Sequence, residues 1–225
     1  MVEGNRVARR KARTRAALVR AAQGFLASGN TNAPVLEITQ AADVSNGSFY
    51  NYFETKEELW QAAIDAALES AGDYLDSLTV GLDDPVEKFT QSFRLSGRLF
   101  RLEPQLSLVL LNSEAAAFAA AGGLAPRSRR DIESAVAQGR FDVDDADVAL
   151  AIVAGSLLSI GRLLLAQPER DEAATVDGTT QRVLRALGIS AEEAETLCSR
   201  ELPTSYSGGV HAAIDPTSDA RDQSR

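Results

Sequence analysis

The sequence is poor in the side chains on which most enzymes and metal sites depend. Its 225 residues include one histidine, His211, and one cysteine, Cys198. A histidine-based acid–base pair, a catalytic triad, a zinc site and an intrachain disulfide are therefore excluded. Glycine-rich phosphate motifs are absent, and the four aspartates within 142–147 lack calcium-loop spacing, so they are interpreted as N-terminal charges of a helix. We expect no enzyme activity, no metal and no cofactor.

Long apolar runs and alternating β-branched residues are also missing. No run of 18 apolar residues occurs, and the basic N-terminus leads into no purely apolar segment, so we expect no membrane span, no signal peptide and a cytoplasmic location. Alanine and leucine are plentiful, which favours helices over strands. With 44% hydrophobic and 24% charged residues, the chain has the composition of a soluble globular protein, and the predicted fold class is all-α.

Positive charge is scarce except at the N-terminus. Residues 1–20 hold seven Lys or Arg against Glu3, a net charge of +6. Because the whole chain has a net charge of −9, the other residues together carry −15. A basic arm on an acidic body favours local contact with phosphates, here through Arg9, Arg10 and Arg13. The alternative is a solvated tail without a partner.

The most informative stretch runs from Val44 to Leu59. Ser45 is a good helix N-cap, and Phe49 and Phe53 lie four residues apart on one helical face, which leaves polar groups on the others. Thr55 to Glu58 forms a capping box, so a second helix begins at once. A short helix with an apolar pair behind and amides and hydroxyls in front suits the DNA major groove. The alternative on composition alone is an ordinary aromatic core helix.

The same stretch resembles the recognition helix of the TetR family of repressors. The family pattern Val-Ser-x-Gly-x-hydrophobe-Tyr-x-x-Phe-x-x-Lys-x-x-Leu is matched at Val44, Ser45, Gly47, Phe49, Tyr50, Phe53, Lys56 and Leu59. By this resemblance, phosphate contacts fall to Tyr50, Tyr52 and Lys56. Contacts with base edges fall to Asn46, Gly47, Ser48 and Asn51.

The resemblance implies two functional units and a tail. Residues 1–54 would form the basic arm and a three-helix helix-turn-helix DNA-binding domain, and residues 55–202 a helical ligand-binding and dimerisation domain. Residues 203–225, rich in Ser, Gly, Asp and Thr, are expected to be disordered. The sequence departs from many family members at Leu36, where some carry a base-reading polar residue. It also departs at Asp43, where glycine is common and a left-handed conformation is expected.

Predicted helices cover most of the chain: 11–28, one from Pro34, 55–78, 85–102, one from Pro104, one from Pro126, 144–167, 177–187 and 191–200. An aromatic stripe with a glycine gap on the 85–102 helix is interpreted as core that leaves room for a ligand or a neighbouring backbone. The adjacent arginines at 94, 98 and 101 are expected to face solvent. The predicted ligand site comprises Phe89, Phe93, Gly97, Phe100, Leu106, Leu110, Asn112 and Phe118.

The helix predicted at 144–167 is apolar nearly all round, so it must be covered on two sides. The helix at 177–187 is its expected neighbour, and the resemblance implies a four-helix bundle between two subunits. The predicted dimer interface comprises Ile152, Gly155, Ser159, Leu163, Val183 and Leu187.

These observations predict a ligand-responsive transcriptional repressor. It would bind a palindromic double-stranded DNA operator as a homodimer and be released by a largely apolar small molecule. Two alternatives remain: an architectural DNA-binding protein without a ligand, and a helical enzyme.

Overall fold

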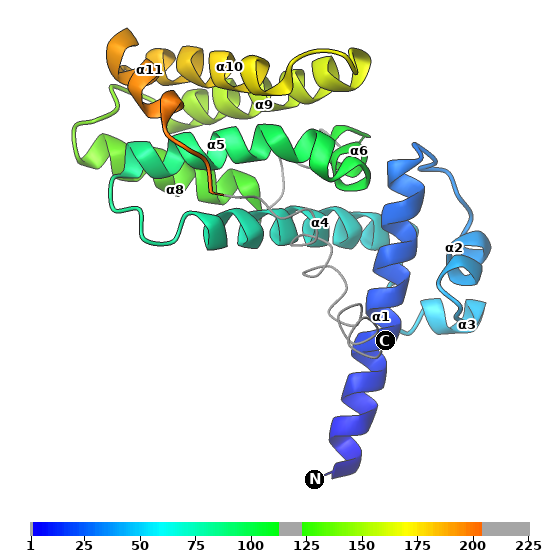
Figure 1. Ribbon diagram of the computed structural model, residues 1–225. Coiled ribbons are helices and arrows are strands. Elements are labelled where there is room, and N and C mark those ends of the chain that lie inside the picture. The colour runs from blue at the N-terminus through cyan, green and yellow to red at the C-terminus, as the bar shows by residue number, and fades with distance from the viewer. Residues whose placement is uncertain (1, 113–122, 204–225) are drawn as a thin grey trace, which may run out of the picture.

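The computed structural model describes residues 2–112 and 123–203, and every regular element in these two ranges is an α-helix (Figure 1). The predicted all-α class is therefore confirmed. The helices are α1 (Val2–Ala27), α2 (Val35–Ala41), α3 (Asn46–Phe49), α4 (Lys56–Leu78), α5 (Pro85–Leu102), α6 (Pro104–Asn112), α8 (Leu124–Ala137), α9 (Ala146–Ala166), α10 (Glu172–Ala186) and α11 (Ala191–Ser199).

Helices α1, α2 and α3 form a small head at one end of the molecule (Figure 1). Helix α1 begins nine residues before the predicted Lys11, so the basic arm is itself helical. Pro34 is the N-cap of α2 in an extended conformation, and its fixed φ of −70° suits that position. Asp43 takes a φ of 54°, the left-handed conformation expected for the turn before α3.

The capping box predicted at Thr55 forms at the start of α4. The Glu58 amide donates to Thr55 Oγ1 at 3.1 Å, and the Glu58 carboxylate accepts from the Glu54 amide at 2.7 Å. Helix α4 therefore begins three residues after Phe53, and it packs against α1. One apolar cluster runs from Leu18 in α1 through Phe49 and Leu59 into α5 and α6. The head is thus packed onto the body.

The body is built around α5, which contacts α4, α6, α8, α9, α10 and α11. A second apolar cluster joins α5 to α8, α9, α10 and α11. Because α5 is enclosed, the expected solvent exposure of its arginines is wrong for Arg94, which is only 5% exposed. Its guanidinium donates from Nε to Asp177 Oδ1 at 2.9 Å and from Nη1 to the Arg200 carbonyl at 2.7 Å. Arg98, also largely buried, donates to the same Asp177 oxygen at 3.0 Å.

Helix α9 is the one helix among the described residues long and apolar enough to cross a membrane, with a mean hydropathy of 2.2. Its packing against α5, α8 and α10 accounts for one apolar face. Asp145 caps it by accepting from the amides of Asp147 and Val148, which confirms the N-terminal role expected for an aspartate there. Val148, Ile152 and Leu165 remain exposed on the opposite side.

Candidate functional site

The recognition segment places its apolar pair inside and its polar groups outside. Phe49 and Phe53 are 0% and 1% exposed, with ring centroids 5.9 Å apart. Asn46, Gly47, Tyr50 and Asn51 are exposed, and Tyr50 keeps 64% of its surface in solvent. Ser48 is half-buried and shares a hydrogen bond of 2.7 Å with Ser45 Oγ. This arrangement offers amides, a backbone glycine and a phenol to an external partner.

Two further groups of the predicted DNA surface border this segment. Tyr52 and Lys56 are half-buried, and Lys56 is the first residue of α4, where free amides favour phosphate oxygens. Arg9, Arg10 and Arg13 are exposed on the part of α1 that projects away from the body (Figure 1). The guanidinium carbon of Arg15, two residues after Arg13, lies 5.0 Å from the centre of the Phe53 ring. Exposed basic groups of α1 and polar groups of the recognition segment therefore both belong to the head.

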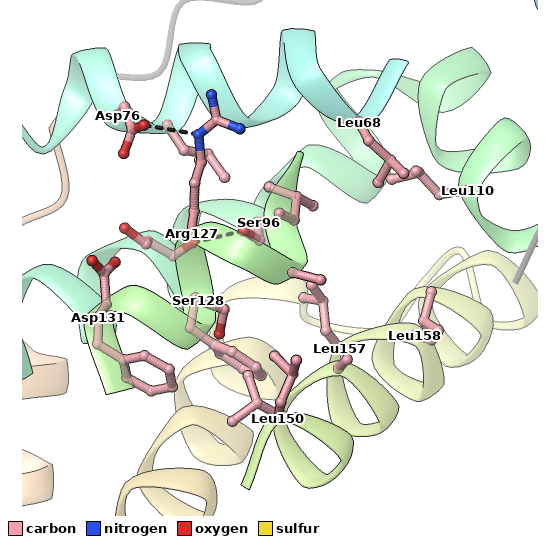
Figure 2. A pocket seen from close by; sticks show the side chains of 18 of the residues that line it. Leu68, Asp76, Ser96, Leu110, Arg127, Ser128, Asp131, Leu150, Leu157 and Leu158 are labelled. Carbon is pink, nitrogen blue, oxygen red and sulfur yellow. Dashed lines mark hydrogen bonds and ion pairs between the residues drawn. The ribbon is translucent and has the colours of Figure 1, made fainter. Parts of the chain in front are cut away.

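A cavity of about 110 Å³ lies in the body, between α4, α5, α6, α8 and α9 (Figure 2). Its walls are mostly apolar. They include Phe89, Phe93 and Phe100 of α5, Leu68 and Leu75 of α4, Leu110 of α6, Leu124 of α8, and Leu150, Val153, Leu157 and Leu158 of α9. The volume is similar to that of cavities of about 150 Å³ that bind benzene in other proteins.

Polar side chains gather at one end of the cavity. Asp76, Arg127, Ser128 and Asp131 lie there, while Leu68, Leu110 and Leu158 lie at the other end (Figure 2). Asp131 is 7% exposed and accepts from Arg130 Nε at 3.2 Å. Burial raises the pKa of Asp131, and Arg130 opposes this shift. Ser128 Oγ is buried without a hydrogen-bond partner.

The structure brings part of the predicted ligand site together. Phe89, Phe93, Phe100 and Leu110 line the cavity, whereas Phe118 lies outside the described residues. Leu106 packs in the apolar cluster that joins the head to the body.

Two polar or small positions of that predicted site have other partners. Gly97 faces α10, where an added Cβ would lie 2.6 Å from Val176 Cγ1, so its gap admits a neighbouring side chain and no ligand. Asn112 donates from Nδ2 to the Leu26 carbonyl at 2.9 Å, at the end of α1. Neither residue lines the cavity.

The polar end of the cavity was missed because its residues come from helices far apart in sequence. Asp76 lies in the last turn of α4, and Arg127, Ser128 and Asp131 belong to α8. In the sequence, Asp76 and the arginines at 127, 129 and 130 look like ordinary surface charges. The one available signal in the sequence is Gly72, a glycine inside α4. A Cβ at this position would lie 2.6 Å from Arg127 Nη1, so the glycine marks a close approach of another segment.

The predicted dimer interface divides into two groups. Ile152 is 42% exposed, Ser159 is exposed, and Gly155 and Leu163 are half-buried on the outer side of α9. Val183 and Leu187, in contrast, are 3% and 1% exposed within the chain's own second apolar cluster. These two are not available to a partner, so their assignment to the interface is wrong.

The lone cysteine offers no reactive group. Cys198 is buried, and burial raises the pKa of its thiol to about 11. The thiol therefore stays protonated at neutral pH, which agrees with a packing role.

Comparisons with known proteins match both parts of the chain. Residues 17–63 match the family model described as bacterial regulatory proteins, tetR family, and residues 84–200 match the tetracyclin repressor-like C-terminal domain. A comparison with curated proteins gives no significant match.

Solved structures extend this likeness over most of the chain. RolR in complex with the ligand resorcinol is 33% identical, covers 88% of this chain and 98% of its own, and has a TM-score of 0.62. RolR without ligand is 34% identical over 84% of this chain and 98% of its own, with a TM-score of 0.66. A tetR family regulator from Shewanella sp. PV-4 shares the fold at 15% identity, covering 79% and 99% of the two chains with a TM-score of 0.69.

Proposed function

Because the chain belongs to the TetR family of bacterial regulatory proteins, we propose that it is a repressor released from DNA by a small aromatic molecule that carries hydroxyl groups. It binds a palindromic operator in the cytoplasm as a homodimer, and it is neither an enzyme nor a membrane protein. Residues 1–54 read DNA, and residues 55–202 bind the effector and dimerise.

The DNA contacts of this proposal are supported by the exposed or half-exposed positions of the recognition segment and its neighbours. Asn46, Gly47, Ser48 and Asn51 face base edges, while Tyr50, Tyr52 and Lys56 hold phosphates. Arg9, Arg10 and Arg13 on the helical arm add phosphate contacts. Two recognition helices must be about 34 Å apart to occupy successive major grooves, which requires a dimer. The outer face of α9 around Ile152 is the proposed seam, because it leaves large apolar side chains exposed in one chain.

The effector class rests on one observation, the polar end of an otherwise apolar cavity. A volume of about 110 Å³ suits a single ring. Ser128 Oγ is buried without a partner, which is costly, so a hydroxyl of the bound molecule would satisfy it. The nearly buried Asp131 carboxylate, which accepts from Arg130, adds a second acceptor at the same end. RolR was solved with resorcinol, a ring with two hydroxyls, which supports the same class for this chain. The expected apolar effector is thereby refined to one with a polar edge.

Release of DNA requires that the effector bind the wrongly spaced dimer more tightly than the DNA-binding one. The typical size of such coupling is about 1–3 kcal/mol. The test is fluorescence anisotropy on a DNA duplex enriched by the wild-type protein from a random pool, titrated with resorcinol, phenol and benzene. We expect release with the hydroxylated rings and little with benzene. If no single-ring compound releases DNA, the effector assignment is wrong, and an architectural DNA-binding role becomes the better hypothesis.

A pair of matched variants tests the polar end directly. Ser128→Ala removes the unpaired hydroxyl and should weaken resorcinol binding by about 2- to 10-fold through one lost hydrogen bond. Ser134→Ala removes a half-buried hydroxyl from the same helix outside the cavity and should leave resorcinol affinity unchanged. Equal affinities for the two variants would place the ligand elsewhere.

A further inference from the structure

One arginine of α8 ties together three carboxylates of α4. Arg127 donates from Nη2 to Glu69 Oε1 at 2.8 Å and to Asp73 Oδ1 at 2.6 Å, and from Nε to Asp76 Oδ2 at 2.8 Å. The three acceptors are spaced by four and three residues, so they form a single stripe on α4. We call Arg127 with Glu69, Asp73 and Asp76 the Arg127 clamp. It fixes α8 against α4 at three successive points.

The backbone next to the clamp is shaped to admit it. A Cβ on Gly72 would lie 2.6–2.8 Å from three atoms of the Arg127 guanidinium group, so any other residue at this position would require the group to shift. A glycine inside a helix is unfavourable relative to alanine, which makes its presence here informative. At the start of α8, the Gly123 amide donates to Glu69 Oε2 at 2.8 Å, and the Gly123 carbonyl accepts from Arg127 Nη1 at 2.9 Å.

Two residues of the Arg127 clamp also line the cavity. Arg127 and Asp76 both line its polar end (Figure 2), whereas Glu69 and Asp73 lie outside it. Hydrogen bonds from Arg127 lower the pKa of Glu69, so this partner is fully ionised at neutral pH. At its other end, α4 begins directly behind the recognition segment and packs on α1. The same helix therefore carries the clamp and supports the DNA-reading head.

We propose that the Arg127 clamp is the element that transmits occupation of the cavity to the head. This inference rests on the proposed function. A hydroxyl bound beside Arg127 and Asp76 competes for their donors and acceptors, which loosens the hold of α8 on α4. Helix α4 then takes a second position, and the head moves with it. Both sites bias the same two-state element, which is the physical requirement for coupling.

The first experiment separates coupling from ligand binding. Glu69→Gln combined with Asp73→Asn weakens the clamp at two residues that do not line the cavity and are half or more exposed. Resorcinol affinity, measured by calorimetry, should stay within about twofold of the wild type. The loss of DNA affinity that resorcinol causes should shrink at least about fivefold, near the lower end of typical allosteric coupling.

The control for this experiment is Asp65→Asn, which removes one charge from the same helix at a residue that pairs with Gln61. It should respond to resorcinol like the wild type. A double variant that also responds like the wild type would overturn the clamp proposal while leaving the proposed function intact.

The second experiment needs no ligand. Gly72→Ala places a Cβ against the guanidinium group and should displace it, weakening binding to the selected DNA by about fivefold or more. Arg127→Ala should weaken DNA binding comparably, and the two changes together should do no more than either alone, because both act on one interaction. Circular dichroism checks that each variant keeps its helix content. If Gly72→Ala binds DNA normally, or if the two effects add, the clamp does not set the position of α4.

Discussion

The side-chain amide of Asn112 donates a hydrogen bond to the backbone carbonyl of Leu26 across 2.9 Å and so joins the end of α6 to the end of α1. The last carbonyls of a helix have no partner within it, so this bond caps α1 from a distant segment. Leu110, two residues before Asn112, lines the cavity. The head is thus attached to the cavity wall through α6 as well as through α4.

Removing this cap should lower the stability of the chain. The Gly29 amide also donates to the Leu26 carbonyl, at 3.0 Å, so Asn112→Ala removes one of its two donors. The variant should reduce the free energy of unfolding by about 0.5–1 kcal/mol, measured by urea denaturation. Asn30→Ala, at an exposed position in the loop after α1, is the matched control and should change stability by less than about 0.5 kcal/mol. Equal stabilities for the two variants would mean that the amide does not cap α1 in solution.

Gly97 should be important for packing and unimportant for the ligand. A Cβ there would lie 2.6 and 2.8 Å from the two γ-carbons of Val176, so Gly97→Ala should cost about 1–3 kcal/mol through overpacking. Val176→Ala in the same chain should recover part of that loss, because it removes the contacting methyl groups. Resorcinol affinity should be unchanged in the folded variant. A loss of ligand binding without a loss of stability would restore Gly97 to the cavity.

Local signals explain why the helix boundaries and the recognition segment could be predicted. The capping box at Thr55, the proline that starts α5 and the left-handed turn at Asp43 all depend on residues close together in sequence. The aromatic stripe of α5 likewise needs only helical spacing to appear, and its three phenylalanines do line the cavity.

The errors come from contacts between distant segments. Arg94 lies 83 residues from its partner Asp177, and Arg127 lies 51 to 58 residues from its three carboxylates. Periodicity shows that arginines share one side of a helix, but it does not show whether other helices cover that side. For the same reason, an apolar stripe containing Val183 and Leu187 does not reveal whether its cover comes from the same chain or from a second copy.

The α9 seam should be sensitive to charge. Ile152→Arg places a charge at the centre of the proposed interface and should weaken the dimer by roughly 2 kcal/mol or more. Light scattering should then give the mass of one 24.0 kDa chain instead of two. Val80→Arg, at an 81% exposed position outside this face, is the control and should remain dimeric.

Leu187 provides the contrasting case within the same assay. Leu187→Ala should lower stability by about 2–5 kcal/mol, because it leaves a cavity in the core of one chain. At equal concentration of folded protein, Leu187→Ala should still give the mass of a dimer in light scattering.

The outcome for Ile152→Arg tests the position of the interface. If that variant remains dimeric, the interface lies on another face.

Lys56 at the start of α4 and Asn51 just after α3 should affect DNA binding in different ways. Lys56→Ala should weaken binding to all sequences alike and reduce the salt dependence by about one ion, as expected for a phosphate contact. Asn51→Ala, at an exposed amide, should instead relax discrimination by about 1–3 kcal/mol at one base pair. Binding to a set of single-base variants of the selected duplex, at two salt concentrations, measures both effects. An unchanged base preference for Asn51→Ala would mean that the segment enters the groove in another orientation.

Asp131 should make stability depend on pH in the direction opposite to an ordinary ion-paired carboxylate. Burial raises its pKa in the folded chain, so folding favours the protonated form. The stability it contributes is full below the pKa of the unfolded chain and is lost as pH rises through the folded value. Asp131→Asn keeps the shape and removes the titration. The variant should therefore gain stability relative to the wild type between pH 4 and pH 7, as measured by urea denaturation.

The comparison with the wild type at each pH isolates this residue, since other carboxylates titrate alike in both proteins. Glu69 and Asp76 act in the opposite sense. Hydrogen bonds from Arg127 lower the pKa of Glu69. Burial acts to raise the pKa of Asp76, but Arg127 and Arg130 lower it on balance. Their stabilisation is present at neutral pH and is lost in acid. If Asp131→Asn instead loses stability toward pH 7, the bond from Arg130 outweighs the burial of the carboxylate, and Asp131 is a structural ion pair with no cost for an effector hydroxyl to relieve.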